Sequence, residues 1–238
     1  MKGINETNTL TASPPRARLR TPVLFGLAAV TGMVDAVCYL GLGHVFTANM
    51  TGNVVLLGFA VAGVESLSVS RSVTALAAFL LGVVLGVRLA RSIYPSIQRW
   101  PAAAFACEAA LLFLSAAVAG SLSVRAPAAL TRVYAVIVLT GVAMGMRNAT
   151  IRRLGEREVN TTVLTMTLTA IGSDSVFAGG SNQGALRRWG FVISVLAGAA
   201  VGALLLRFSA GLTLGVAAVT SSVCATAAYL DTQQPART

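Results

Sequence analysis

Six apolar segments, each close to the length that crosses a bilayer, constrain this chain more than any other feature. They cover residues 23–42, 73–94, 101–121, 130–147, 188–206 and 209–229. A spanning helix needs roughly 20 apolar residues, because each residue advances it by about 1.5 Å across a hydrocarbon core of about 30 Å. The sequence therefore predicts an all-α membrane protein with six transmembrane helices.

The composition supports a membrane protein and argues against other classes. Of the 238 residues, 55% are hydrophobic and only 11% are charged, which leaves no room for a sizeable soluble domain. The net charge of +10 does not indicate nucleic-acid binding, because the basic residues stand in short gaps between apolar segments rather than on one polar face. The lipid bilayer is therefore the expected partner, and nucleic acid is not.

Two shorter apolar segments, 50–64 and 160–178, decide how many helices cross the membrane. Cytoplasmic gaps carry an excess of Lys and Arg. If both segments enter and leave on the same side, 14 of the 18 basic residues lie in the cytoplasm together with both termini, counting a loop from Arg147 to Arg157. If both segments span, 10 basic residues lie in the cytoplasm and 8 lie on the other side. We therefore expect six spanning helices and two re-entrant or broken segments.

The two halves of the chain resemble each other in sequence. Residues 32–36 recur at 145–149, an offset of 113, and the pair Gly82/Gly86 recurs as Gly198/Gly202, an offset of 116. With three spans per half, the second half must enter from the opposite side, as in transporters built from inverted repeats. We expect a first repeat over 23–121 and a second over 130–229, between a disordered cytoplasmic tail over 1–22 and a cytoplasmic tail over 230–238.

The polar stretch 44–53 and the nearby carboxyl of Asp35 are the main candidates for a solute pathway. Asp35 lies beyond the middle of the first apolar segment, where a carboxylate is costly and therefore marks a candidate functional site. The alternative is a structural carboxyl that caps the broken segment of the other half. The candidate residues are Asp35, Thr47, Asn49, Thr51, Gly52 and Asn53 in the first half, and Asn148, Thr161, Thr165 and Asp174 in the second.

The polar groups of this stretch have two compatible roles. Asn49 or Thr51 is a favourable N-cap for a helix over 52–64, and the start of such a helix also presents free N–H groups to a ligand. Gly52 permits close approach of a ligand or a neighbouring helix. In the repeat, Thr47, Thr51 and Asn53 fall on Thr161, Thr165 and Thr167 at an offset of 114, and Asp35 falls on Asn148.

Other polar and small residues have structural interpretations beside functional ones. Glu108 is expected either to line a pathway or to pair with Arg147. The three cysteines, Cys38, Cys107 and Cys224, lie inside apolar segments without metal-ligand spacing and are expected to be buried. Four Gly-xxx-Gly pairs, Gly82/Gly86, Gly141/Gly145, Gly198/Gly202 and Gly211/Gly215, form flat helix faces. We expect these faces to pack within the chain, with a homo-oligomer as the alternative.

No sequence pattern of a catalytic or cofactor site is present. The chain has no G-x-S-x-G, HExxH or GxxxxGK[ST] motif in a usable context, and it has a single histidine. We therefore expect a protein that is not an enzyme and that holds no metal or cofactor.

The residues Gly32-Met33-Val34-Asp35-Ala36, followed by 46–53 (Phe-Thr-Ala-Asn-Met-Thr-Gly-Asn), resemble the YoaK-like family of bacterial integral membrane proteins, a domain family of unknown function. The likeness runs over almost the whole chain after the N-terminal tail. The resemblance implies a multi-pass protein of the bacterial inner membrane, without an established substrate. The second half departs from the motif, since Thr165-Met166-Thr167 stands where a Thr-Gly-Asn element is expected.

These observations lead to a prediction of function. A buried carboxylate beside a polar break favours a transporter or permease for a small solute, with proton or ion coupling through Asp35. The second hypothesis is a membrane protein that does not transport: a receptor, a scaffold or a lipid-binding protein. We expect both termini on the cytoplasmic side of the bacterial inner membrane.

Overall fold

The computed structural model describes residues 19–92, 100–120, 129–154 and 161–231, and these residues form helices and connecting loops only. The elements are α1 (Thr21–Gly41), α2 (Met50–Val61), α3 (Val69–Ser92), α4 (Trp100–Gly120), α5 (Ala129–Leu154), α6 (Thr161–Ser173), the 3-10 helix η2 (Val176–Ala178), α7 (Ala185–Leu206) and α8 (Ala210–Asp231). The predicted all-α class is confirmed. The predicted tails fall mostly outside the described residues, although α1 begins inside the first and α8 ends inside the second.

Six of the described helices, α1, α3, α4, α5, α7 and α8, are long and apolar enough to cross a membrane, as predicted. Helices α2 and α6 have 12 and 13 residues. At about 1.5 Å per residue they are about 18–20 Å long, shorter than a hydrocarbon core of about 30 Å.

The largest difference from a predicted span is at the end of the fourth apolar segment. The fourth apolar segment was expected to end at 147 and to be followed by a loop from Arg147 to Arg157. Instead α5 continues to Leu154 and carries Arg147, which is buried, inside the bundle. Arg152 and Arg153 stand in its last turn, and Arg157 lies outside the described residues.

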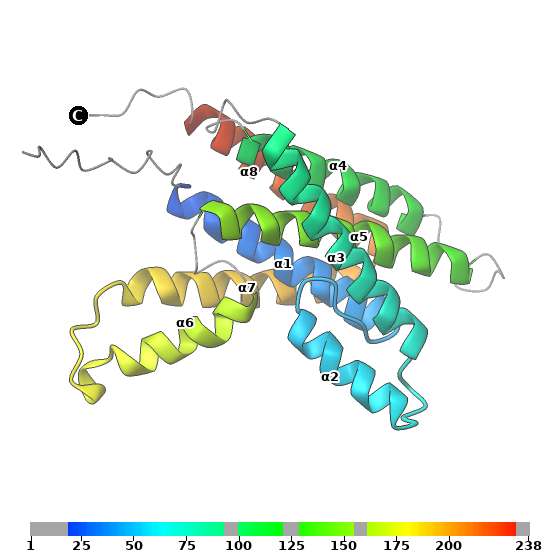
Figure 1. Ribbon diagram of the computed structural model, residues 1–238, viewed down its shortest axis with the longest axis horizontal. Coiled ribbons are helices and arrows are strands. Elements are labelled where there is room, and N and C mark those ends of the chain that lie inside the picture. Colours follow the sequence, from blue (N-terminus) through cyan, green and yellow to red (C-terminus); the bar gives the residue numbers. More distant parts are fainter. Residues whose placement is uncertain (1–18, 93–99, 121–128, 155–160, 232–238) are drawn as a thin grey trace, which may run out of the picture.

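The long helices form one bundle, and the two short helices lie at its side. Helix α3 packs on α5, α1 packs on α7, and α4 packs on α8, while α4 also contacts α5 and α1 also contacts α8. Figure 1 shows α2 beside the lower part of α3 and α6 beside α7, both extending away from the bundle. Most large side chains on α2, such as Val54 and Phe59, are exposed, as expected for surfaces that face lipid.

The glycine contacts show whether neighbouring helices run parallel or antiparallel. Gly82 of α3 meets Val142 of α5, and Gly86 meets Met146, so these helices run parallel. Gly198 and Gly202 of α7 meet Ala29 and Met33 of α1 in the same way. Helices α4 and α8 run antiparallel, because Gly120 meets Gly211 while Glu108 meets Ser221. A chain with eight crossing helices requires α4 and α8 to run in the same direction, so this packing opposes the eight-helix alternative.

The two ends of the bundle differ in charge. An ion pair of 2.7 Å joins Arg20 before α1 to Asp231 of α8, and Ala90, Trp100 and Leu154 pack together where α3, α4 and α5 meet. We call this the arginine-rich end; it carries Arg20, Arg88, Arg91, Arg152, Arg153, Arg187 and Arg188, whereas the opposite end carries Arg71, Arg132 and Arg207 among the described residues.

Small residues are used mainly for packing inside the chain. A Cβ atom at Gly82 would lie 2.2 Å from the Val142 carbonyl oxygen, and one at Gly198 would lie 2.0 Å from the Ala29 oxygen. Gly215 has no neighbour within 4 Å of such an atom. Burial of Cys38 and Cys224 is confirmed, but the expectation for Cys107 is wrong, because this residue is exposed on the outer surface of α4.

Candidate functional site

The chain reverses direction after α1 and runs back along it. Gly43 and His44 have φ of 92° and 61°, in the left-handed region that glycine tolerates best. Phe46 then stacks on Tyr39 with ring centroids 4.9 Å apart. Thr47 Oγ1 lies 3.3 Å from Cys38 Sγ, so successive loop residues contact successively earlier residues of α1.

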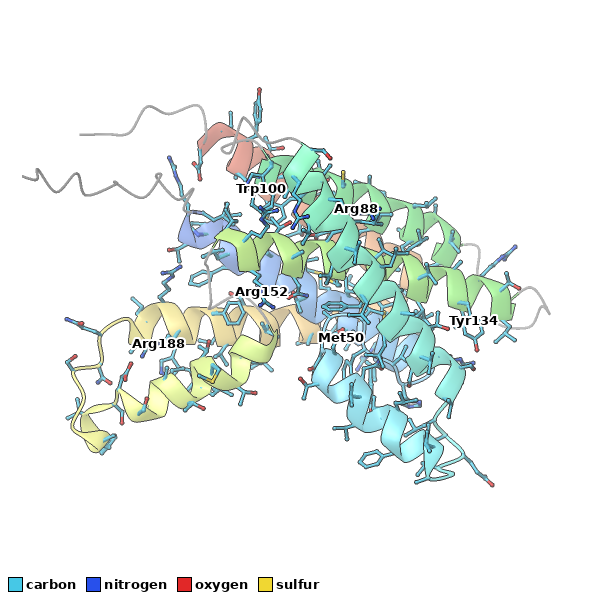
Figure 2. The ribbon with its side chains drawn as sticks, in the orientation of Figure 1. Met50, Arg88, Trp100, Tyr134, Arg152 and Arg188 are labelled. Atoms are coloured by element: carbon cyan, nitrogen blue, oxygen red, sulfur yellow. The ribbon has the colours of Figure 1, made fainter. Side chains whose placement is uncertain are left out.

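Asp35 holds the inner end of this returning loop. Its Oδ1 accepts the backbone N–H of Thr47 at 3.1 Å and that of Ala48 at 3.0 Å. Asp35 stands six residues before Gly41, the last residue of α1, which places it about 9 Å inside the helix end. Helix α2 begins two residues after Ala48, so its start lies near the depth of Asp35 along α1, at the side of the bundle. Figures 1 and 2 show this arrangement, with Met50 at the inner end of α2.

The first turn of α2 is fixed by two asparagines. Asn49 is the N-cap, and its side-chain oxygen accepts the N–H of Gly52 at 3.4 Å, which confirms the capping role. Asn53 is fully buried; its Oδ1 accepts the Phe46 N–H at 3.3 Å and its Nδ2 donates to the Ser72 carbonyl of α3 at 3.1 Å. Asn53 therefore ties the loop and α2 to the bundle.

The remaining candidates of the first half lie around this group. Thr51 is exposed. A Cβ atom at Gly52 would lie 3.1 Å from the Phe46 ring, so the missing side chain makes room for Phe46. The structure thus brings Asp35, Thr47, Asn49, Gly52 and Asn53 together, as the spacing suggested.

Asp35 and Asn148, which the sequence comparison pairs, have different environments. The structural alternative expected Asp35 to cap the broken segment of the other half, and this is wrong, because Asp35 binds the segment that follows it in its own half. Asn148 instead donates to the Met144 carbonyl at 2.9 Å, within its own helix. The segment of the second half that corresponds to the returning loop, 155–160, lies outside the described residues.

This difference predicts unequal effects of two matched substitutions. We expect Asp35→Ala to lower the free energy of unfolding by about 2–3 kcal/mol, because two buried N–H groups lose a carboxylate acceptor. Asn148→Ala should cost less than about 1 kcal/mol, since Met144 O remains bonded within α5. Denaturant unfolding of both variants in detergent micelles measures the difference, and equal losses would contradict the anchoring role of Asp35.

The candidates of the second half do not join this group. Thr161 begins α6, and its side chain lies outside the described residues, while Thr165 is exposed. Asp174 follows α6 and forms an ion pair of 2.6 Å with Arg188 of α7, which also donates to the Ala170 carbonyl at 3.1 Å. No hydrogen bond or ion pair between described residues links Thr165 or Asp174 to the group around Asp35.

Thr167 is the counterpart of Asn53 and is also buried. Its exposed fraction is 3%, but its hydroxyl has no hydrogen-bond partner among the described residues. An unpaired buried hydroxyl costs about 1–3 kcal/mol. Helix α6 is therefore less well anchored at this position than α2 is at Asn53.

A second polar group lies at the centre of the bundle. Arg147 of α5 binds Glu108 of α4 through two parallel contacts, Nε to Oε2 at 2.8 Å and Nη2 to Oε1. Arg147 Nη1 donates to the Leu27 carbonyl at 2.7 Å and to Thr31 Oγ1 at 2.8 Å, both on α1. Ser221 of α8 donates to Glu108 Oε1 at 2.7 Å. This group, which we call the central ion pair, joins four helices and has both charges almost fully buried.

The central ion pair confirms the structural interpretation of Glu108. A buried charge in a membrane is costly unless it is paired and hydrogen-bonded, and here both partners are satisfied. Ser221 follows Glu108 by 113 residues, the offset that also separates residues 32–36 from 145–149. The group joins helices from both halves of the chain, with Glu108 in the first half and Arg147 and Ser221 in the second.

Sequence reasoning missed several members of these two groups. Thr31 and Ser221 bind the central ion pair, and Thr140 Oγ1 lies 3.6 Å from Cys38 Sγ near the returning loop. One signal was present for Arg147: the small residues Gly141 and Gly145 continue at the same spacing to Ala149, whose Cβ lies near Gly86. This pattern predicts that the packed helix extends past Arg147.

These features define a multi-pass α-helical membrane protein. The chain belongs to the DUF1275 family, described as proteins of unknown function, whose sequence model matches residues 23–227. It is 37% identical over 161 residues to the UPF0700 transmembrane protein YoaK of Bacillus subtilis (strain 168), covering 66% of this chain and 68% of that protein. This confirms the YoaK-like resemblance. No solved structure matches the chain.

Proposed function

We propose that the protein is a transporter or permease for a small polar solute, with its polar site at the start of α2. The observation that carries the proposal is the return of the loop to the depth of Asp35, about 9 Å inside the end of α1. Non-helical backbone at membrane depth is tolerated where protein covers it or where it lines a water-filled cavity. Asn49, Thr51 and the free N–H groups of the first turn would then face the solute.

The proposed architecture is a pair of inverted halves, each with a re-entrant segment. The glycine contacts support it. Between α3 and α5, Gly82 meets Val142 and Gly86 meets Met146; between α7 and α1, Gly198 meets Ala29 and Gly202 meets Met33. Each glycine of the second set follows its counterpart by 116 residues, and each partner precedes its counterpart by 113. The antiparallel packing of α4 on α8 supports an inverted relation, and the lengths of α2 and α6 support segments that do not cross.

Asp35 offers a route for proton coupling. An ionised carboxylate accepts the Thr47 and Ala48 N–H groups through charge-assisted bonds, which are about twice as strong as neutral ones. Protonation would weaken the attachment of the loop and release the start of α2. A proton gradient would thereby bias the position of the loop.

The charge of the bundle ends supports a location and an orientation. Seven described arginines lie at the arginine-rich end and three at the other. Because cytoplasmic ends carry the excess of basic residues, we propose that α1 begins and α8 ends in the cytoplasm of a bacterial cell.

Water access to the start of α2 tests the proposal. In a protein whose three cysteines are replaced by serine or alanine, we expect Thr51→Cys to react with a charged, membrane-impermeant thiol reagent. Leu80→Cys is the matched control, since Leu80 is 62% exposed on α3 and would face lipid. Reaction at 51 with none at 80 supports a wet site, whereas equal lack of reaction at both positions contradicts it.

A receptor, scaffold or lipid-binding protein is the alternative, and one observation favours it. Asn53 satisfies the Phe46 N–H and the Ser72 carbonyl, and Asp35 satisfies two further N–H groups. A loop that satisfies its own polar groups is able to remain dry. Under this alternative Thr51→Cys stays unreactive from both sides of the membrane.

A further inference from the structure

Three arginines stand near the ends of α3 and α5 at the arginine-rich end, where α4 begins. Arg88 and Arg91 stand three residues apart on α3, so they share one face of that helix. Arg153 stands one residue before the end of the parallel helix α5, and its Nη1 lies 3.4 Å from the Val87 carbonyl of α3. All three side chains belong to exposed residues.

An aromatic residue lies beneath one of these charges, that of Arg153. The guanidinium carbon of Arg153 lies 5.9 Å from the ring centre of Trp100, within the range of a cation–π contact. Trp100 packs with Ala90 and Leu154 at the first turn of α4, and Figure 2 labels it beside Arg88 on the upper part of the bundle. Because α3 and α5, which are long enough to cross a membrane, end here and α4 begins here, the three arginines stand near headgroup depth.

The described carboxylates do not neutralise this cluster. None of the three arginines forms an ion pair with a described residue. Asp35 binds the loop, and Glu65 precedes α3 at the opposite end. The other described carboxylates, Glu108, Asp174 and Asp231, pair with Arg147, Arg188 and Arg20. Among the described residues, the guanidinium groups of the cluster are therefore available to an anion.

The surface next to the cluster is apolar and lipid-sized. Leu81 and Val84 precede Arg88 and Arg91 at intervals of three and four residues, so the four lie on one face of α3. Leu81 and Val84 are about half exposed. An acyl chain would lie along these two residues while its headgroup reaches the arginines, an arrangement that a free phosphate ion cannot use.

We propose that Arg88, Arg91, Arg153 and Trp100 form a binding site for the phosphodiester headgroup of an anionic phospholipid. Guanidinium groups bind phosphate oxygens through paired, charge-assisted hydrogen bonds, and arginines near an anionic membrane surface contribute about 1 kcal/mol each, or about fivefold in affinity. This site is separate from the start of α2 and does not depend on transport.

Binding of a short-chain phosphatidylglycerol to the full chain in neutral detergent tests the site. We expect phosphatidylglycerol to raise the unfolding temperature, with little effect of short-chain phosphatidylcholine or of inorganic phosphate at equal concentration. The double variant R91Q/R153Q should bind about 25-fold more weakly, the product of two fivefold losses. R153K, which keeps the charge but loses the planar fork, should lose only part of the affinity and guards against a folding defect.

The matched control is R207Q, which removes one exposed arginine at the opposite end of the bundle. It should leave phosphatidylglycerol binding unchanged. If R207Q and R153Q weakened phosphatidylglycerol binding equally, the proposed site would be wrong, because the lipid would then be attracted by the positive charge of the whole surface. If inorganic phosphate or phosphatidylcholine stabilised the protein as much as phosphatidylglycerol does, the assignment to an anionic lipid would be wrong.

Discussion

Replacing Glu108 by alanine is expected to destabilise the protein by about 3–5 kcal/mol, the loss that follows when one partner of a buried ion pair is removed. Arg147 would keep its contacts to Leu27 and Thr31 on α1 but would carry an unpaired charge inside the membrane. Denaturant unfolding in detergent micelles measures the change, and Arg147→Ala should give a loss of similar size.

The double variant E108L/R147M separates the pair from its surroundings. Buried ion pairs are often replaced by apolar side chains of similar volume at little cost, and Thr31 still has the Leu27 carbonyl as a partner at 3.1 Å. We expect the double variant to be more stable than either single alanine variant. A loss below about 1 kcal/mol in Glu108→Ala would contradict the role given to the central ion pair.

Substitution of the packed glycines is the second large expected effect. A methyl group at Gly82 would lie 2.2 Å from the Val142 carbonyl oxygen, and because both atoms belong to helix backbones, α3 and α5 must separate. We expect Gly82→Ala to cost about 3 kcal/mol or more, at the upper end of overpacking effects. Gly198→Ala, which meets the Ala29 oxygen at 2.0 Å, should cost a similar amount.

Gly215 provides the matched control, because a methyl group there meets nothing within 4 Å. Gly215→Ala should be neutral or stabilising by up to about 1 kcal/mol, since alanine favours a helix over glycine. Thermal unfolding of the three variants compares them directly. If Gly82→Ala were as stable as Gly215→Ala, the close α3–α5 contact would be wrong.

The six long helices were predictable because hydropathy is a local property of the sequence. Each apolar segment must satisfy its own backbone inside lipid, so segment and helix coincide. The glycine pairs were predictable for the same reason, since a four-residue spacing fixes a helix face before its partner is known.

The central ion pair was only partly predictable, and Arg147 shows why. A single charge lowers the hydropathy of the residues around it. An arginine whose partner is not known therefore looks like the end of an apolar segment. Its carboxylate partner Glu108 comes from another helix, 39 residues earlier in the chain. A local pattern does not reveal that pairing, and the last two turns of α5 were assigned to a loop as a result.

The role of Asp35 was unpredictable for a different reason. Its partners are backbone N–H groups of Thr47 and Ala48, which every residue type provides. Their position depends on the left-handed turn at Gly43 and His44, and only the glycine hints at it in the sequence. Spacing therefore grouped residues that lie around Asp35, whereas the structural alternative placed the cap in the other half.

The side of the membrane reached by three exposed loop positions tests the account most directly. Ser66→Cys before α3, Phe208→Cys before α8 and Ser181→Cys before α7 would each be labelled with an impermeant thiol reagent in sealed vesicles of known orientation. If six helices cross the membrane and α2 and α6 return to the side they entered from, the cysteines at positions 66 and 208 react from one side of the membrane. The cysteine at position 181 then reacts from the other side. Reaction of 66 and 181 from the same side, with 208 opposite, would contradict the account and require eight crossing helices.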